Sequence, residues 1–143
     1  MGDIQIRYAT DTDLPYLQRS DDLVSELVMR KKVSDSRVIV AVKDGSHLGW
    51  LRFGFWWDLF PFMNLIVVEE EARGKGTGRK LVEFWEKEMK AQGHNLVITS
   101  TDANEDAQRF HRKMGYRDSG CILFPKELFP ASTLEILLLK VLK

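Results

Sequence analysis

The sequence has little cysteine, no long apolar run and no excess of charge of either sign. Its single cysteine, Cys121, excludes an internal disulfide and a cysteine-based zinc site, which favours a reducing compartment. Its apolar runs, such as residues 65–68 and 136–139, are far shorter than the roughly 18 residues that a membrane helix needs. The opening residues, MGDIQIRYA, lack the basic and apolar regions of a secretion signal. We therefore expect a cytoplasmic protein that does not enter a membrane.

The charges balance, with 21 Lys and Arg against 21 Asp and Glu in 143 residues. Proteins that bind nucleic acid usually carry a basic excess or a concentrated basic stripe, so we expect no nucleic-acid partner. An apolar fraction of 44% is typical of an ordinary globular protein. Because the chain shows no repeat, low-complexity tract or long linker, we expect one domain over residues 1–143.

The hydrophobic pattern predicts strands that alternate with helices. Strands are expected at residues 4–8, 37–42, 47–56, 62–68, 95–101, 116–124 and 134–141. Helices are expected after Asp13, over residues 21–32, after residue 78 as far as Gly93, and over residues 102–115. Asp44-Gly45 predicts a hairpin turn, and strand 62–68 is apolar enough for burial on both faces. Hairpins at both ends of an alternating α/β pattern indicate a mixed α+β fold whose sheet is not purely parallel.

The stretch EEEARGKGTGRK, residues 69–80, lies between a predicted strand and a predicted amphipathic helix. Three of its glycines alternate with other residues: Gly74, Gly76 and Gly78. Backbone N–H groups at the start of a helix are unpaired and carry partial positive charge, so they bind phosphate well. The first turn of this helix carries Arg79 and Lys80 instead of Asp or Glu, which is unfavourable unless an outside anion supplies the negative charge. A tight turn whose basic residues balance the three glutamates is the alternative.

Spacing excludes two common phosphate motifs. A Walker loop counted from Gly74 requires glycine where the chain has Arg79, and the G-x-G-x-x-G dinucleotide motif also requires its third glycine there. The pattern R-x-x-G-x-G does match, as Arg73, Gly76 and Gly78. In these residues the chain resembles the GNAT superfamily of acyl-CoA-dependent N-acyltransferases.

A second segment strengthens the resemblance. The family pattern N-x-x-A-x-x-F-Y-x-x-x-G-F has its counterpart in Asn104, Ala107, Phe110, His111, Gly115 and Tyr116. The two motifs and their spacing cover about residues 62–120, and RYATDTDLP also looks like the first strand and helix of the family. The resemblance implies one GNAT-like acyltransferase domain with a mixed, mostly antiparallel central sheet flanked by helices.

The resemblance also implies acetyl-CoA as co-substrate and no metal. The loop amides would bind the pyrophosphate of CoA, the pantetheine arm would pair with the backbone near Val68, and Asn104 would border the arm. The expected CoA-binding residues are Val68, Arg73, Gly74, Lys75, Gly76, Thr77, Gly78, Arg79 and Asn104. The family often has proline at the position of Glu70, and we expect the three glutamates to face solvent because they would otherwise repel phosphate.

The catalytic residues are less clear from the resemblance. His111 stands where many family members carry a tyrosine proposed to protonate the leaving thiolate, and an ordinary histidine pKa near 6.5 suits an acid at neutral pH. The alternative for His111 is a half-buried packing residue. Strand 62–68 contains no carboxylate, so Asp58, just before it, is the candidate base, although a carboxylate in a turn is often a solvated surface group. A strand N–H near Val68 would stabilise the oxyanion.

The acceptor is the least defined part of the prediction. Five aromatic residues are expected either around the acceptor pocket or in the core: Trp50, Trp56, Trp57, Phe60 and Phe62. His47 and His94 are expected to be exposed loop residues, and Cys121 to have no catalytic role. The favoured function is acetyl transfer to a primary amine of a small molecule or peptide, by a monomer or a homodimer. The alternatives are a non-catalytic acyl-CoA-binding or sensing module and, disfavoured by the spacings above, a nucleotide-using phosphate-binding protein.

Overall fold

The computed structural model describes residues 2–130 and 134–143. Within these ranges the chain forms seven strands: β1 (Gln5–Tyr8), β2 (Val38–Lys43), β3 (Ser46–Trp56), β4 (Phe60–Val68), β5 (Leu96–Asp102), β6 (Arg117–Leu123) and β7 (Leu134–Val141). The same ranges contain four α-helices: α1 (Leu14–Ser20), α2 (Glu26–Ser34), α3 (Thr77–Ala91) and α4 (Ala107–Lys113). Two short 3-10 helices, η1 (Asp11–Asp13) and η2 (Glu70–Ala72), precede α1 and follow β4.

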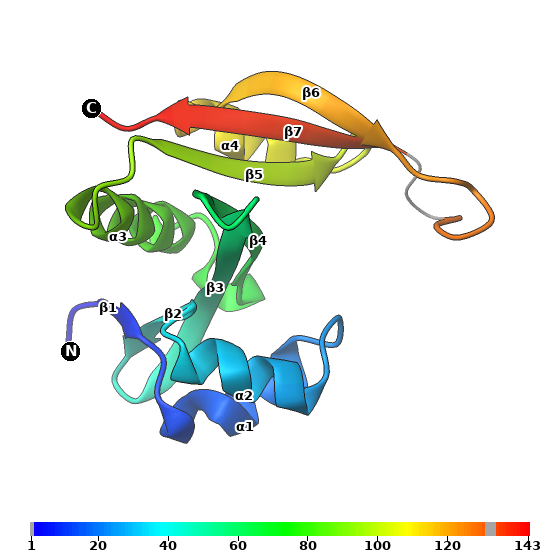
Figure 1. Cartoon of the computed structure of the whole chain (residues 1–143). Helices are drawn as coiled ribbons and strands as arrows, with labels where there is room; N and C mark the ends of the chain where they lie inside the picture. The colour runs from blue at the N-terminus through cyan, green and yellow to red at the C-terminus, as the bar shows by residue number, and fades with distance from the viewer. Residues whose placement is uncertain (1, 131–133) are drawn as a thin grey trace. The chain divides into compact units, whose positions relative to one another are not determined.

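The strands are hydrogen-bonded in the order β1-β2-β3-β4-β5-β7-β6 (Figure 1). β4 pairs with β5 in parallel, whereas β1 with β2, β2 with β3, β5 with β7 and β6 with β7 pair antiparallel. The predicted mixed α+β fold, with a mostly antiparallel sheet and flanking helices, is therefore confirmed. The chain divides into two compact units, Met1–Gly54 with Leu65–Lys87 and Phe55–Asn64 with Glu88–Lys143. We call these the first and second unit; the prediction of one domain over residues 1–143 stays a prediction.

The first unit holds β1, β2, most of β3 and the end of β4, together with α1, α2 and most of α3. Asp44 and Gly45 form the predicted hairpin turn between β2 and β3, with φ values of 50° and 79°, and the turn has only these two residues. Helices α1 and α2 lie side by side, and their apolar residues pack with β2 and β3 in one core cluster (Figure 1). Leu17, Met29 and Trp50 in this cluster are almost completely buried.

Strands β3 and β4 approach each other very closely at Gly49. A Cβ atom on Gly49 would lie 2.5 Å from the carbonyl oxygen of Val67, so the strands keep this spacing only with glycine there. One residue earlier, the Leu48 carbonyl accepts the N–H of Glu69 at 2.8 Å. Leu65 and Val67 pack against the core cluster, which places that face of β4 on the side of α1 and α2. The end of β4 is thus tightly fixed before the glycine-rich loop begins.

Several details of the first unit differ from the sequence-based expectations. α2 begins at Glu26, capped by the Ser25 side chain, because Asp21 is occupied in a buried ion pair with Arg52 at 2.9 Å. His47 is not an exposed loop residue: its Nε2 lies 2.7 Å from Asp13, and its ring stacks on Tyr16. Asp13 occupies the N-cap position of α1, but its side chain makes no cap hydrogen bond to that helix. Its carboxylate accepts the N–H of Thr10 rather than one in α1.

The second unit contains the start of β4 together with β5, β7 and β6, and α4 covers one face of this sheet (Figure 1). Gly115, with φ of 98°, follows α4, as predicted for the end of that helix. Strand β4 is not buried on both faces as predicted, because Asn64 is exposed and residues 65–68 are only half-buried. α4 is shorter than predicted, since Asp102 still belongs to β5 and uses its carboxylate to accept the N–H of Asn104.

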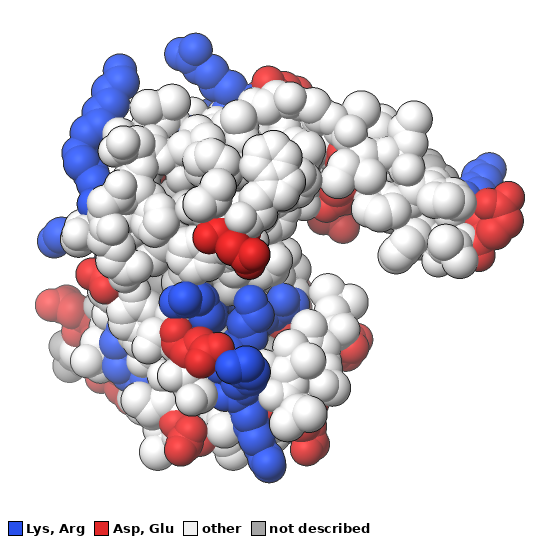
Figure 2. All heavy atoms as spheres, viewed as in Figure 1, with Lys and Arg blue, Asp and Glu red and all other residues white. Residues whose placement is uncertain are grey.

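The surface carries both signs of charge. On the face shown in Figure 2, basic and acidic side chains are interspersed, and wide areas carry neither. None of the helices in the described part of the chain combines the length and apolarity needed to span a membrane.

The buried pair between Asp21 and Arg52 provides a stability test. Both residues are at most 6% exposed, so Asp21→Asn leaves a guanidinium buried without its counter-ion. We expect a loss of about 3 kcal/mol in the free energy of unfolding, measured by urea denaturation. The control is Asp35→Asn, which removes the exposed pair with Lys31 at 3.1 Å and should cost about 0–1 kcal/mol. Equal losses in the two variants would contradict this interpretation.

Candidate functional site

The glycine-rich loop lies entirely in the first unit, between η2 and α3, and side chains fix both of its ends. The Nε of Arg73 donates to the carbonyl of Val68 at 3.0 Å, which folds the loop back onto the end of β4. The buried hydroxyl of Thr77 donates to the carbonyl of Ala72 at 3.2 Å, which ties the start of α3 to η2. The N–H of Lys80 then donates to the carbonyl of Gly76 at 3.0 Å. The loop therefore has a defined backbone path.

Two of the glycines have backbone conformations that other residues rarely adopt. Gly74 and Gly76 have φ values of 74° and 83°, and a Cβ atom at either position would have no neighbour within 4 Å. A lack of space for a side chain is therefore not the reason for glycine at these positions. The reason is the backbone conformation, which glycine adopts without strain. Gly78 differs, because it lies inside the first turn of α3.

The electrostatics at this loop favour an anion. The first turn of α3 contains no acidic residue, and its N–H groups carry the partial positive charge of a helix terminus. Arg79 pairs with Glu83 at 3.6 Å, but both side chains are more than half exposed and such a pair contributes little. In the part of the chain that the structure describes, Lys75 and Lys80 have no ion pair. A small, strongly charged anion is the ligand that this arrangement suits.

The three glutamates before the loop do not behave alike. Glu70 and Glu71 are exposed on η2, as expected. Glu69 is half-buried, and its Oε1 accepts the hydroxyl of Tyr16 at 2.6 Å. This contact is not predictable from the sequence alone. Tyr16 and Glu69 are 53 residues apart, and no local pattern connects them.

The orientation of Val68 follows from its neighbour. Backbone groups alternate between the two edges of a strand, and the N–H of Glu69 points to β3 because it donates to Leu48. The N–H of Val68 therefore points to the opposite edge of β4. The pairing of β4 with β5 on that edge is at Phe62 and Met63, so Val68 lies beyond it. This is the geometry that a backbone donor to a ligand requires.

The other predicted site residues, Asn104, Asp58 and His111, belong to the second unit. Asn104 is exposed in the turn after β5, where its N–H donates to the Asp102 carboxylate at 2.8 Å. Asp58 is exposed in the turn between β3 and β4, and it shares with Trp57 a positive φ, 60° and 56° respectively. The structure thus groups the predicted loop residues and Val68 in one unit, and the remaining three in the other.

His111 is deeply buried on α4. Its side chain lies against the rings of Phe110 and Tyr116, and only 3% of the residue is exposed. Burial lowers the pKa of the imidazole to about 4, because the charged form loses its hydration. At neutral pH the ring is therefore uncharged. Among the described residues, Nδ1 of His111 is one of two buried side-chain nitrogens without a hydrogen-bond partner.

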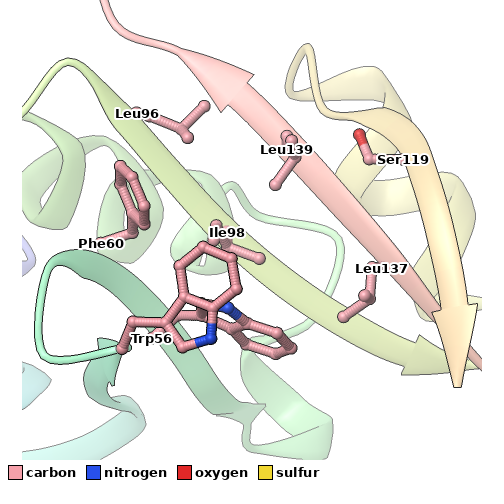
Figure 3. Close-up of a pocket in the computed structure, with 8 residues that line it drawn as sticks. Trp56, Phe60, Leu96, Ile98, Ser119, Leu137 and Leu139 are labelled. Atoms are coloured by element: carbon pink, nitrogen blue, oxygen red, sulfur yellow. The ribbon is translucent and has the colours of Figure 1, made fainter.

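An apolar pocket of about 230 Å³ lies in the second unit. Figure 3 shows the side chains that surround it, which come from β3, β4, β5, β6 and β7 and from the turn between β3 and β4. The lining residues are Trp56, Trp57, Phe60, Leu96, Ile98, Ser119, Leu137 and Leu139. Three of the five predicted aromatic residues thus line a pocket, whereas Trp50 is core and Phe62 packs on Trp56 with ring centroids 5.7 Å apart. An apolar or aromatic group fits this lining.

The described residues also contain no cluster of side chains suited to bind a metal ion. Within residues 2–130 and 134–143, no three His, Cys, Asp or Glu side chains lie close enough together to hold a metal ion. Cys121 is exposed on β6. Neither observation adds a residue to the candidate site.

Comparison with known proteins gives one family and many similar folds. The model of the acetyltransferase (GNAT) family matches residues 4–116. Ard1 of Thermoplasma volcanium has a TM-score of 0.83 at 16% identity, with 98% of each chain covered. The ribosomal-protein-alanine N-acetyltransferase of Brucella melitensis has a TM-score of 0.80 at 22% identity, covering 96% of this chain and 99% of that one. The yncA protein of Salmonella typhimurium, solved with its cofactor acetyl-CoA, has a TM-score of 0.82 at 18% identity, covering 99% and 95%. No curated protein sequence matches the chain.

The lowered pKa of His111 predicts a pH dependence of stability. Because the folded-state pKa of about 4 lies below the unfolded value near 6.5, the unfolded chain binds more protons between these pH values. The free energy of unfolding should therefore fall as pH drops from 6.5 towards 4, by up to about 3 kcal/mol from this residue. Urea denaturation of His111→Gln should show a smaller fall over this range. A slope for His111→Gln equal to that of the wild type would contradict the assignment.

Proposed function

Because the chain belongs to the acetyltransferase (GNAT) family, we propose that it is an acetyl-CoA-dependent N-acetyltransferase that acts on a primary amine of a small molecule or peptide. The observation that carries this proposal is the loop that opens α3. It combines two open glycines at positive φ with a first helical turn that has basic residues and no acidic one. A pyrophosphate is small and doubly charged, so the N–H groups of such a loop bind it well.

The proposed CoA site uses the backbone more than side chains. The amides of residues 74–79 bind the pyrophosphate, and Lys75 adds positive charge beside them. The pantetheine arm pairs with the edge of β4 at Val68, whose carbonyl is already held by Arg73. Asn104 borders the arm. Support comes from the motif match and from the anchored, outward-facing loop in the first unit.

The proposed reaction is direct transfer without a covalent enzyme intermediate. The neutral amine nitrogen attacks the thioester carbonyl carbon, the new C–N bond forms and the C–S bond breaks. The CoA sulfur leaves with the electron pair of the C–S bond, and the nitrogen loses one proton. The N–H of Val68 donates to the oxyanion while the tetrahedral intermediate exists. A thiol has a pKa near 8.5, so its thiolate departs readily and acid assistance matters less than positioning.

His111 and Asp58 remain proposed as catalytic residues. The uncharged imidazole of His111 still has one N–H, so it can orient the leaving sulfur by a hydrogen bond, although it is a weaker acid than an imidazolium. Asp58 is proposed as the base because strand residues 60–68 contain no carboxylate. Its exposed turn position supports a surface role more than a base, so Asp58 carries less of the proposal.

A non-catalytic acyl-CoA-binding module is the second candidate function. One observation favours it: the residue at the position of the family's tyrosine is a buried histidine whose pKa is lowered to about 4, which removes the usual acid. Such a protein would keep the CoA loop and bind the thioester without transferring it.

The CoA loop is tested by a charge at Gly76. Gly76→Asp places a carboxylate where the pyrophosphate would bind, so stabilisation by CoA in a thermal-shift measurement should be lost. The matched control is Gly45→Asp, because Gly45 has a similar φ of 79° in the turn between β2 and β3, also with open space around it. That variant should introduce similar backbone strain but should still be stabilised by CoA in the thermal-shift measurement. Tight CoA binding by Gly76→Asp would refute the loop assignment.

Turnover separates the enzyme from the binding module. With acetyl-CoA and a panel of amines, a thiol-reactive dye should detect CoA release only when a suitable acceptor is present. The panel includes peptides because the similar Brucella fold belongs to an enzyme named for a ribosomal-protein alanine acceptor. His111→Ala should lower turnover about tenfold to a hundredfold while CoA stabilisation persists. CoA stabilisation without turnover for any acceptor would favour the binding module.

A further inference from the structure

Glu69 differs from its two acidic neighbours in burial and orientation, which indicates a functional role for its carboxylate. It is the first residue after β4, so it adjoins Val68, the residue proposed to donate to the thioester oxygen. Glu70 and Glu71 point into solvent from η2, whereas Glu69 is half-buried. Side chains alternate along a strand, so Glu69 projects to the same side of β4 as Leu65 and Val67, which is the side of α1.

The carboxylate of Glu69 is held in place by Tyr16. The hydroxyl of Tyr16 donates to Oε1 at 2.6 Å, a short distance typical of a bond to a charged acceptor. Burial and the neighbouring Glu69 raise the pKa of Tyr16 above its ordinary value, so the proton stays on the tyrosine. The direction of this hydrogen bond is therefore fixed: Tyr16 donates and Glu69 accepts.

Tyr16 is itself fixed by a chain of contacts. Its ring stacks on the ring of His47, with centroids 4.1 Å apart and planes 10° from parallel. Nε2 of His47 lies 2.7 Å from the carboxylate of Asp13, and that carboxylate also accepts two hydrogen bonds from Arg7 at 2.7 and 3.0 Å. All of these residues belong to the first unit, as does the CoA loop. The position of Glu69 is thus held by packing as well as by one hydrogen bond.

Glu69 nevertheless lacks a cation. Across the described ranges 2–130 and 134–143, no Lys, Arg or His forms an ion pair with it, and its Oε2 has no hydrogen-bond partner. Asp13, by contrast, has Arg7 and His47, and Asp21 has Arg52. A partly buried carboxylate is unfavourable unless a cation or water satisfies it. One oxygen is positioned by the protein and the other is available.

We propose that Oε2 of Glu69 binds the ammonium group of the acceptor, with Tyr16 as the residue that positions the carboxylate. This inference rests on the proposed function and narrows its substrate class to primary amines that arrive as cations. Because a carboxylate favours the charged form of a bound amine, Glu69 strengthens binding but does not promote deprotonation. Its loss therefore raises the KM for the amine more than it lowers kcat, which separates this role from that of a general base.

The variants for the test are Glu69→Gln and Tyr16→Phe, with Glu70→Gln as the matched control. Glu69→Gln keeps the shape and can still accept from Tyr16, but it loses the charge. Its KM for the amine should rise about tenfold or more, with kcat and the KM for acetyl-CoA nearly unchanged. Tyr16→Phe keeps the ring on His47 and should raise the same KM by a smaller factor. Glu70→Gln should match the wild type.

A binding measurement tests the inference without turnover. In the CoA-bound protein, backbone NMR signals around Glu69 should shift on titration with n-butylammonium chloride and stay unchanged with n-butanol, the neutral analogue. Glu69→Gln should lose the response to n-butylammonium, and Tyr16→Phe should weaken it. Equal responses to the two compounds, or equal behaviour of Glu69→Gln and Glu70→Gln, would overturn the inference. CoA release by the wild type with no amine, while these shifts appear, would instead count against the proposed function alone.

Discussion

The close packing of β3 on β4 at Gly49 determines the geometry at the end of β4, where the glycine-rich loop begins. With no side chain at Gly49, the Val67 carbonyl sits against β3, and the next N–H on that edge, from Glu69, reaches the Leu48 carbonyl. Because backbone groups and side chains alternate along a strand, this contact then determines the orientation of Val68 and Glu69. Val68 presents its N–H at the opposite edge, and Glu69 projects its side chain towards α1. Any larger residue at Gly49 would displace both groups together.

The first unit also has opposite charges on the two sides of the end of β4. The first turn of α3 has no acidic residue, and among the described residues Lys75 and Lys80 beside it have no ion pair. Glu69, on the α1 side, carries a carboxylate that has no ion pair within residues 2–130 and 134–143. These two sites, each without its counter-charge, match the charges of the two proposed reactants. The pyrophosphate of CoA is an anion, and an amine arrives as a cation. Asp21 and Arg52, by contrast, pair with each other inside the first unit at 2.9 Å.

Much of the fold was predictable from the sequence because its signals are local. The Asp44-Gly45 turn, the ends of α3 and α4 at glycines, and most strand ranges depend on residues a few positions apart. The same holds for the glycine-rich loop, whose place between a strand and a helix was predicted from adjacent residues. Prediction failed where a distant partner decides the outcome. Arg52 takes Asp21 out of the expected second helix, and Asp13 takes His47 off the surface.

The site was only partly predictable for the same reason. The position of His111 followed from its motif, but its burial and lowered pKa depend on Phe110, Tyr116 and the sheet around them. The partnership of Tyr16 with Glu69 crosses 53 residues, and the sequence shows only three glutamates in a row. The sequence does not show which of the three glutamates is half-buried, because exposure depends on the folded chain.

The cations at the start of α3 make the free energy of unfolding depend on the anions in the surrounding solution as well as on the sequence. Lys75, Lys80 and the terminal amides of α3 hold positive charge together in the folded state only, so any anion that binds there favours folding over unfolding. Phosphate or sulfate in a buffer is then a weak ligand, and ionic strength acts on the same site by screening. The free energy of unfolding will depend on which salt is present. Under the proposed function, CoA and its thioesters bind this loop, so the ligand-free protein would be the least stable form in a cell.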